Sequence, residues 1–270
     1  MIPKTIHYCW FGKKPKPKLA EYCIKSWKKY CPDYEITEWN EENFDISASP
    51  LYVRQAYEAQ KWAFVTDYVR LWAMTKFGGI YMDTDVEVIK PLDSFLKNEA
   101  FSGFESQILI PTGIMASQKD FPLFVEFLQE YDNIPFVLED GSFDITTNVT
   151  RITNCCSKYG FIPNAEYQVI NGFALYPPEF FCPKDFITGT INTTKNTYAI
   201  HHFGASWYTE EQQKQKKQRW KKEKKRLKKV RRQQFIDMVI HIPNYVMRYL
   251  LGKETYERIK KVFKGKKADI

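Results

Sequence analysis

The clearest pattern of apolar and polar positions lies between residues 63 and 91. Apolar side chains recur at roughly helical intervals from residue 64 to residue 75, which predicts a helix. The pair Gly78 and Gly79 ends it, because glycine accepts the left-handed backbone that many helix C-termini require. Over residues 80–89 apolar and polar side chains alternate instead. That alternation predicts one strand with its acidic residues on a single face.

Similar patterns divide the chain before and after this stretch. Strands are expected at the start of residues 2–12 and at 34–39, 101–104 and 108–115, and helices at 19–30, 51–61 and 122–131. Strands and helices therefore alternate in the first half of the chain. That order indicates an α/β fold in which a sheet lies between layers of helices.

Four charged residues between positions 63 and 91 are candidates for catalysis or ligand binding. Asp83 and Asp85 lie two positions apart on the predicted strand, so both carboxylates can hold one divalent cation. Oxygen ligands of this kind suit Mn2+ or Mg2+. Asp67 and Arg70 lie three positions apart, which makes them neighbours on one helix surface. They are either part of the same site or a helix salt bridge that contributes about 0.2–0.5 kcal/mol.

Two other stretches contain aromatic and imidazole side chains that are candidates for the site. Tyr8 and Trp10 follow the first strand, and open α/β sheets bind ligands at the carboxyl ends of their strands; core packing is the alternative for Trp10. A later strand ends in His201 and His202, and Trp207 follows. This segment can supply an imidazole to the metal and an indole N–H to a phosphate oxygen. Alternation lets only one histidine face the site, and we favour His202; a surface histidine pair is the other interpretation.

Length and composition favour one domain with a small appendage. The chain has 270 residues, of which 44% are hydrophobic, enough to bury one substantial core. Its six cysteines form no C-x-x-C pair and no zinc-type spacing, which suits free thiols in a reducing compartment. No apolar run begins the chain, and no uncharged apolar run reaches 18 residues. We therefore expect neither a signal peptide nor a spanning helix, and a cytoplasmic location.

Charge separates an acidic body from a basic tail. Residues 1–213 hold 19 Lys and Arg against 27 Asp and Glu, a net charge of −8, whereas residues 214–270 hold 21 against 5, a net charge of +16. Within residues 214–232 there are 13 basic side chains and one acidic side chain, and apolar stripes at helical spacing follow over 235–250. This pattern is typical of a helix that binds an anionic membrane surface. Packing of the stripe on the protein's own core is an alternative, and nucleic-acid binding is less favoured because the tail has no recognisable nucleic-acid-binding fold.

Three separated motifs resemble those of glycosyltransferase family 32, whose members include enzymes of capsular polysaccharide synthesis. They are Ile-Pro-Lys-x-Ile-His-x-x-Trp at residues 2–10, Asp-x-x-Arg with Phe-Gly-Gly and Ile-Tyr-x-Asp-x-Asp-Val within 67–86, and His-His-x-x-x-Ser-Trp at 201–207. The resemblance implies a GT-A-type catalytic domain over residues 1–213, with a Rossmann-like mixed sheet flanked by helices. It also implies retaining transfer of a hexose from a nucleotide sugar.

The same resemblance implies roles for individual residues. Trp10 would be an aromatic platform for the uracil of a UDP-sugar, and Asp85 would hold the metal with Asp83 and one of the two histidines. Asn148 stands where family members commonly have Thr-Gly-Pro, so its role is left open. Catalytic roles are expected for Asp67, Arg70 and Asp85, and donor contacts for Tyr8, Trp10, Asp67, Arg70, Tyr81, Asp83 and Trp207.

The function expected from these observations is hexosyl transfer, with galactose or glucose favoured, in capsular or surface polysaccharide assembly. The basic tail favours a glycan acceptor linked to polyprenyl diphosphate and a peripheral position on the inner face of the cell membrane. One competing enzyme class is a haloacid-dehalogenase-like phosphohydrolase, whose nucleophile motif is also Asp-x-Asp. That motif has Thr or Val where this chain has Glu87, and it includes no preceding Asp-x-x-Arg helix. A basic nucleic-acid-binding protein is the non-enzymatic alternative.

Overall fold

The computed structural model describes residues 1–106, 108–205, 210–241, 254–255 and 257. Residues 1–213 form one compact unit and residues 214–270 another. None of the described helices is long and apolar enough to cross a membrane.

A seven-stranded mixed sheet lies at the centre of the first unit, in the order β2-β1-β3-β6-β5-β8-β7. The strand pairs β1–β2, β1–β3 and β5–β8 are parallel, and β3–β6, β5–β6 and β7–β8 are antiparallel. Its strands are β1 (Thr5–Cys9), β2 (Glu35–Trp39), β3 (Gly79–Met82), β5 (Ala100–Gly103), β6 (Ile114–Ser117), β7 (Gln168–Ile170) and β8 (Phe173–Tyr176). A separate two-stranded sheet pairs β4 (Val86–Val88) with β9 (Ala199–His201).

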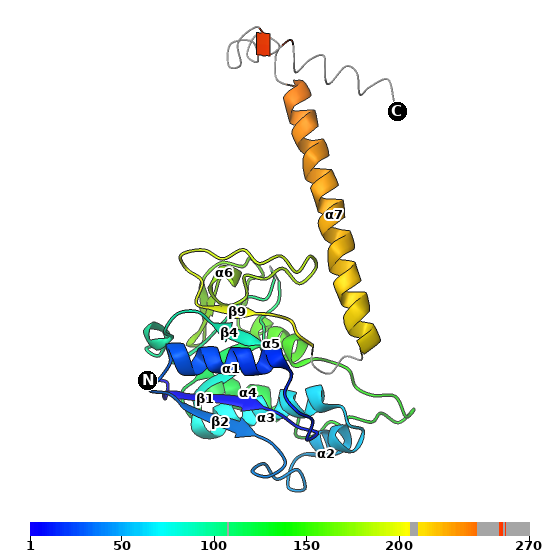
Figure 1. Ribbon diagram of the computed structural model, residues 1–270. Coiled ribbons are helices and arrows are strands. Elements are labelled where there is room, and N and C mark those ends of the chain that lie inside the picture. The colour runs from blue at the N-terminus through cyan, green and yellow to red at the C-terminus, as the bar shows by residue number, and fades with distance from the viewer. Residues whose placement is uncertain (107, 206–209, 242–253, 256, 258–270) are drawn as a thin grey trace. The chain divides into compact units, whose positions relative to one another are not determined.

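Helices cover both faces of the central sheet, as the alternating element order predicts (Figure 1). One face packs on α2 (Leu51–Glu58), α3 (Trp62–Phe77), α4 (Pro122–Gln129) and α5 (Asn148–Ser157). The other packs on α1 (Lys18–Tyr30), the 3-10 turn η1 (Asp93–Phe95) and α6 (Pro178–Phe181). Strand alternation explains the two cores: Tyr81 belongs to the first, and its neighbours Ile80 and Met82 belong to the second. The predicted α/β class, a mixed sheet flanked by helices, is confirmed.

Two predicted strands differ from the structure. Residues 80–89 do not form one strand, because β3 ends at Met82 and β4 begins at Val86 in the other sheet. The strand predicted at 108–115 is displaced, since β6 runs from Ile114 to Ser117. Both differences arise from pairing with distant segments, which apolar alternation along the chain does not report.

The C-terminal basic segment lies in α7 (Glu210–His241), and most of its described side chains from 214 to 235 are exposed. Most of the apolar stripe expected at 235–250 lies outside the residues whose side chains the structure describes, so the stripe stays a prediction. All six cysteines are buried free thiols.

The α3–β3 junction gives a stability prediction at Gly79. Its φ is +107°, and a Cβ there would lie 2.7 Å from the Thr5 carbonyl oxygen. The Gly79→Ala variant is therefore expected to lose about 2 kcal/mol of unfolding free energy, measured by urea denaturation. Gly141→Ala is the matched control, because Gly141 also has positive φ but open space around it. Equal losses in the two variants would contradict a steric origin at Gly79.

Candidate active site

The Asp-x-Asp motif forms a turn between the two sheets. Asp83 donates its backbone N–H to the Gly113 carbonyl oxygen at 2.8 Å, and Val86 donates its backbone N–H to the Asp83 carbonyl oxygen at 2.9 Å. The chain then enters β4, where Val86 lies opposite His201 of β9. This turn, and not the uninterrupted strand expected from the sequence, brings both carboxylates toward β9.

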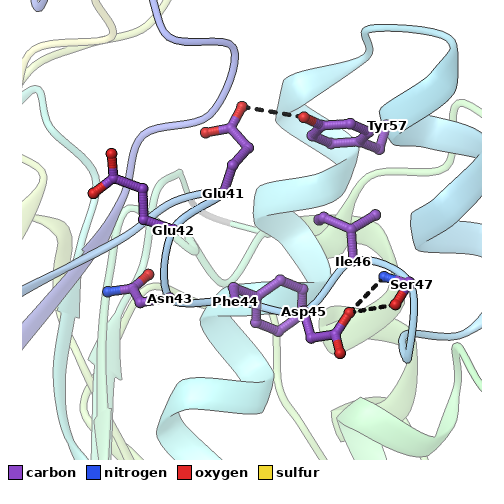
Figure 2. Close-up of a pocket in the computed structure, with 8 residues that line it drawn as sticks. All are labelled: Glu41, Glu42, Asn43, Phe44, Asp45, Ile46, Ser47 and Tyr57. Carbon is purple, nitrogen blue, oxygen red and sulfur yellow. Dashed lines mark hydrogen bonds between the residues drawn. The ribbon is translucent and has the colours of Figure 1, made fainter.

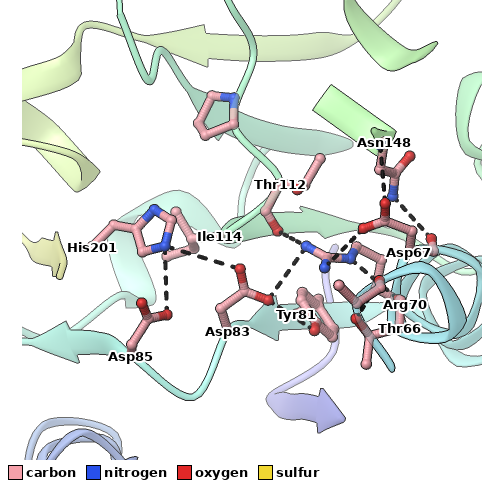
Figure 3. A network of polar contacts seen from close by, with 12 residues as sticks. Thr66, Asp67, Arg70, Tyr81, Asp83, Asp85, Thr112, Ile114, Asn148 and His201 are labelled. Carbon is pink, nitrogen blue, oxygen red and sulfur yellow. Dashed lines mark hydrogen bonds and ion pairs between the residues drawn. The ribbon is translucent and has the colours of Figure 1, made fainter. Parts of the chain in front are cut away.

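Asp83, Asp85 and His201 form a cluster whose potential ligand atoms all lie within 4.8 Å of one another. His201 Nε2 is 3.4 Å from Asp85 Oδ1 and 4.0 Å from Asp83 Oδ2 (Figure 3). Gly113 makes room for the imidazole, because a Cβ there would lie 2.8 Å from the ring. We call these three residues the Asp-Asp-His cluster.

The electrostatics of this cluster favour a negative Asp85 carboxylate beside a positive partner. Burial opposes the charge of Asp85, but His201 and the Gly204 backbone N–H outweigh it and hold the Asp85 pKa at about 2. Burial likewise opposes the charge of His201, but Asp85 raises the pKa of that imidazole well above its ordinary value. A divalent cation can take the place of the imidazolium proton, and two carboxylates with one imidazole are suitable ligands for Mn2+ or Mg2+. The donor set therefore fits the expected metal.

His202, the histidine favoured from sequence, points elsewhere. Its Nε2 lies 2.9 Å from Glu87 Oε2, and Tyr22 donates its hydroxyl to Glu87 Oε1 at 2.6 Å. Because neighbouring strand residues face opposite ways, the register that turns His201 to the aspartates turns His202 away. Among the described residues His201 is thus the histidine that lies beside Asp83 and Asp85, whereas His202, the one favoured from the sequence, pairs with Glu87.

This geometry predicts different results for the two histidines. The His201→Gln variant is expected to bind Mn2+ about 100-fold or more weakly, because an imidazole in the ligand group is lost. The His202→Gln variant is expected to stay within about threefold of the parent, since its ring pairs with Glu87 instead. Calorimetric titration with Mn2+ measures both. A larger loss for His202→Gln would contradict this assignment.

Arg70 connects α3 to the Asp-x-Asp turn. Its guanidinium lies 3.1 Å from Asp67 Oδ1 and 3.3 Å from Asp83 Oδ1, and donates to the Thr112 carbonyl oxygen at 2.7 Å (Figure 3). Tyr81 donates its hydroxyl to the same Asp83 oxygen at 3.0 Å. Arg70 is only 5% exposed, so this is a buried bridge between two carboxylates and not an exposed helix salt bridge.

Asn148, at the start of α5, holds Asp67 from the side away from the turn. It donates its backbone N–H to Asp67 Oδ2 at 3.1 Å and its side-chain N–H to the Asp67 carbonyl oxygen at 2.9 Å. Burial raises the pKa of Asp67 to about 6 even though Arg70 and the Asn148 N–H favour the charged form. The family resemblance alone left the role of Asn148 open. The local sequence signal near Asn148 is Thr147, a residue type that favours the N-cap position and so marks the start of α5.

Glu105 is a residue that the sequence analysis missed. Burial raises the pKa of its carboxyl group, His201 opposes this rise, and the negative charges of Asp83 and Asp85 add to it. Glu105 therefore lies within electrostatic reach of the Asp-Asp-His cluster. It follows β5 and belongs to no recognisable motif, so only the folded chain brings it there.

The predicted donor residues outside this network lie near the end of β1 or outside the described residues. Tyr8 is buried and donates its hydroxyl to Glu38. Trp10 is partly exposed, donates its indole N–H to the Lys14 carbonyl oxygen at 2.6 Å, and has the Lys16 ammonium 5.9 Å from its ring centroid. The position of Trp207 is not among the described residues, so its expected contact with a phosphate stays a prediction.

A hollow of about 570 Å³ lies beside the loop that follows β2 (Figure 2). Glu41 is held there by the Gly12 backbone N–H at 2.7 Å and by the Tyr57 hydroxyl at 3.4 Å. The lining residues are Glu41, Glu42, Asn43, Phe44, Asp45, Ile46, Ser47 and Tyr57. None of them belongs to the Asp-Asp-His cluster. Through its hydrogen bond with the Gly12 N–H, Glu41 connects the lining of the hollow to the loop at residues 10–12.

Comparisons with known proteins agree with this site. Residues 17–102 match the family described as the glycosyltransferase sugar-binding region containing the DXD motif. Inositol phosphoceramide mannosyltransferase 3 of Schizosaccharomyces pombe is 29% identical over 139 residues, which cover 50% of this chain and 38% of that protein's length.

Similar solved structures include the PaToxG glycosyltransferase, with 18% identity, a TM-score of 0.44, and coverage of 58% of this chain and 68% of that one. The galactosyltransferase LgtC with donor and acceptor sugar analogs has 16% identity, a TM-score of 0.40, and coverage of 76% and 90%. The matched residues 17–102 contain both the Asp67–Arg70 helix and the Asp83–Asp85 turn. That segment is therefore similar to the glycosyltransferase sugar-binding region containing the DXD motif.

Proposed function

We propose that this protein is a metal-dependent glycosyltransferase that transfers a hexose from a UDP-sugar to a glycan acceptor with retention of anomeric configuration. The observation that carries the proposal is that Arg70, within the matched DXD region, joins Asp67 to Asp83 of the Asp-Asp-His cluster. A sugar diphosphate needs a cation for its phosphates and hydrogen-bonding groups for its hexose. The Asp-Asp-His cluster would hold the cation, and Asp67 and Arg70 would supply the hydrogen-bonding groups.

Each part of the network has a role in this function. Mn2+ or Mg2+ held by the Asp-Asp-His cluster would neutralise the diphosphate leaving group. Arg70 keeps Asp83 oriented. The two oxygens of Asp67 contact Arg70 and the Asn148 N–H, and we propose that this carboxylate also accepts a hydrogen bond from a hexose hydroxyl. Trp10 and Tyr8 lie near the end of β1, where the base of the nucleotide is expected. We propose attack by the acceptor hydroxyl on the face that the diphosphate leaves, with a phosphate oxygen accepting the proton.

The donor sugar and acceptor are finer parts of the proposal. Galactose and glucose remain the favoured hexoses, and the mannosyltransferase relative adds mannose to the donors worth testing. The acceptor is proposed to be a polyprenyl-diphosphate-linked glycan of capsular or surface polysaccharide synthesis. An enzyme that uses soluble and lipid-linked acceptors equally well would contradict this choice.

The basic tail supports a peripheral position on the inner, cytoplasmic face of the cell membrane. Its 13 basic side chains between residues 214 and 232 are mostly exposed on α7, and each Lys or Arg near an anionic bilayer contributes about 1 kcal/mol. Replacing Lys221, Lys222, Lys224 and Lys225 by Gln is expected to weaken binding to phosphatidylserine vesicles by about 100-fold or more. The same four positions changed to Arg are the control and should bind like the parent. Binding unaffected by the Gln changes would contradict the membrane role.

The competing functions are less favoured. The family match is to a glycosyltransferase region, and the buried Arg70 bridge has no place in a haloacid-dehalogenase nucleophile motif. Nucleic-acid binding would place the function in the tail and leave the Asp-Asp-His cluster without a purpose.

Donor hydrolysis is the experiment that tests the proposed function. The full chain is incubated with UDP-galactose, UDP-glucose and GDP-mannose, with Mn2+ or with EDTA. Release of UDP from one UDP-sugar, in the presence of Mn2+ but not of EDTA, supports the proposal and identifies the sugar. Release of GDP from GDP-mannose instead would contradict the UDP-sugar donor. Failure to release nucleotide, together with no calorimetric binding of UDP in the presence of Mn2+, would contradict it.

A further inference from the structure

Four polar side chains lie together on the side of Asp67 away from the Asp-x-Asp turn. The rings of Tyr52 and Tyr131 are 5.0 Å apart, and the Arg151 guanidinium lies 5.8 Å and 5.2 Å from their centroids. Asn148 is one helical turn from Arg151 on α5 and binds Asp67 through two hydrogen bonds (Figure 3). We call Tyr52, Tyr131, Asn148 and Arg151 the α5 polar cluster.

Each member of the α5 polar cluster has a buried polar atom without a hydrogen-bond partner among the described residues. These atoms are Tyr52 Oη, Tyr131 Oη, Asn148 Oδ1 and Arg151 Nε. Tyr52 and Tyr131 are 0% exposed and Asn148 is 1% exposed, so bulk water does not satisfy them. Leaving a buried polar atom unpaired is costly, and four such atoms in one place require a common explanation.

The unpaired atoms are complementary in a way that one or two water molecules can satisfy. The hydroxyls of Tyr52 and Tyr131 can donate or accept, Asn148 Oδ1 can only accept, and Arg151 Nε can only donate. A water molecule donates two hydrogen bonds and accepts two, and buried waters in proteins usually make about three. Arg151 is already anchored by its ion pair with Asp144, so no second anion is needed to balance its charge.

The cluster is also coupled to Asp67 electrostatically. Burial raises the pKa of Tyr131, and the negative charge of Asp67 raises it further. Burial and the negative charge of Asp67 also raise the pKa of Tyr52, whereas the nearby Arg151 guanidinium lowers it. Both phenols therefore stay protonated, and their hydroxyls can donate hydrogen bonds in the field of the Asp67 carboxylate.

We propose that the α5 polar cluster binds ordered water, and that the hydrated cluster holds Asp67 in the orientation that engages Arg70. The proposal of a water site depends only on the burial of these side chains and on their unpaired polar atoms. The positioning of Asp67 rests on the proposed function, in which Asp67 binds the donor hexose. Tyr52, Tyr131 and Asn148 are then positioning residues that do not touch the substrate.

The Tyr52→Phe and Tyr131→Phe variants separate a hydrated cluster from a dry one. If water binds the hydroxyls, each variant loses hydrogen bonds, and its folding equilibrium constant should fall about 3- to 10-fold. The folding equilibrium constant of the double variant should fall by less than the product of the two single-variant factors, because both hydroxyls share the same water. Tyr34→Phe is the matched control, since Tyr34 also has a buried unpaired hydroxyl but packs in the other core. Single variants that are as stable as the parent or more stable would overturn the water site.

A crystal structure of the full chain gives a direct test that does not depend on activity. Water within hydrogen-bonding distance of Tyr131 Oη or Asn148 Oδ1 supports the proposal. A dry cluster at a resolution where other buried waters are visible overturns it.

Kinetics test the positioning of Asp67 separately. With the donor identified by hydrolysis, the Tyr131→Phe variant should raise KM for that donor about threefold or more while kcat changes less, and Tyr34→Phe should change neither. Unchanged KM in the Tyr131→Phe variant overturns the positioning role. A parent chain that uses no donor contradicts the proposed function and the positioning role together, whereas the stability series and the crystal structure still decide the water site.

Discussion

The Asp85→Asn variant is expected to lose metal-dependent nucleotide release by about 10³-fold or more. Asp85 holds the centre of the Asp-Asp-His cluster, with one carboxylate oxygen facing His201 and the other accepting the Gly204 backbone N–H. An amide of the same shape removes the negative charge that the cation requires. Electrostatic stabilisation of the leaving group commonly supplies a factor of this size in catalysis.

Two measurements separate this effect from misfolding. The Asp85→Asn variant should bind Mn2+ much more weakly than the parent in calorimetry and should still bind UDP weakly without metal. Asp93→Asn is the matched control: the same chemical change is made at a carboxylate that pairs with exposed Lys4, and release should stay near the parental rate. Parental Mn2+ affinity and parental release in Asp85→Asn would show that the Asp-Asp-His cluster is not the metal site.

The Arg70→Met variant is expected to lose about 3–5 kcal/mol of unfolding free energy. Arg70 is buried between Asp67 and Asp83, and its guanidinium also donates to the Thr112 carbonyl oxygen. Methionine fills a similar volume but leaves the buried Asp67 carboxylate, the partly buried Asp83 carboxylate and a carbonyl oxygen without their partner. Urea denaturation of the variant measures the loss.

The double variant Asp67→Asn with Arg70→Met identifies the source of that loss. Removing one of the stranded charges should recover part of the stability, so the two changes are expected to be strongly non-additive. Arg54→Met serves as the control on the exposed side of α2, where Arg54 donates to the Ser49 carbonyl oxygen, and its effect should be within about 0.5 kcal/mol. An Arg70→Met variant as stable as Arg54→Met would contradict the bridge.

Local sequence was enough to locate most of α3, the glycine junction and the Asp-x-Asp motif. A three-residue spacing puts Asp67 and Arg70 on one helix surface in any α-helix, and the positive φ at Gly78 and Gly79 is a conformation that glycine adopts without strain. Charge composition likewise separated the basic tail from the acidic body without any knowledge of packing. These features depend on residues that are neighbours in the chain.

The choice between His201 and His202 required long-range pairing. Alternation states that the two histidines face opposite ways but not which way, and the register of β9 against β4 decides it. The break between Met82 and Val86 has the same origin, because β3 pairs in one sheet and β4 in the other. An apolar alternation that continues through a turn looks, in sequence, like one strand.

The buried neighbours of Asp67 came only from the tertiary structure. Asn148 lies 81 positions from Asp67, and Tyr52 and Tyr131 reach the same place from α2 and from the turn after α4. No local pattern marks such residues, because their role follows from which faces of separate helices meet. The chain's own periodicity thus determined the elements and the charged motif, while the pairing of distant strands and helices decided which side chains share a site, since burial and register are properties of the whole fold.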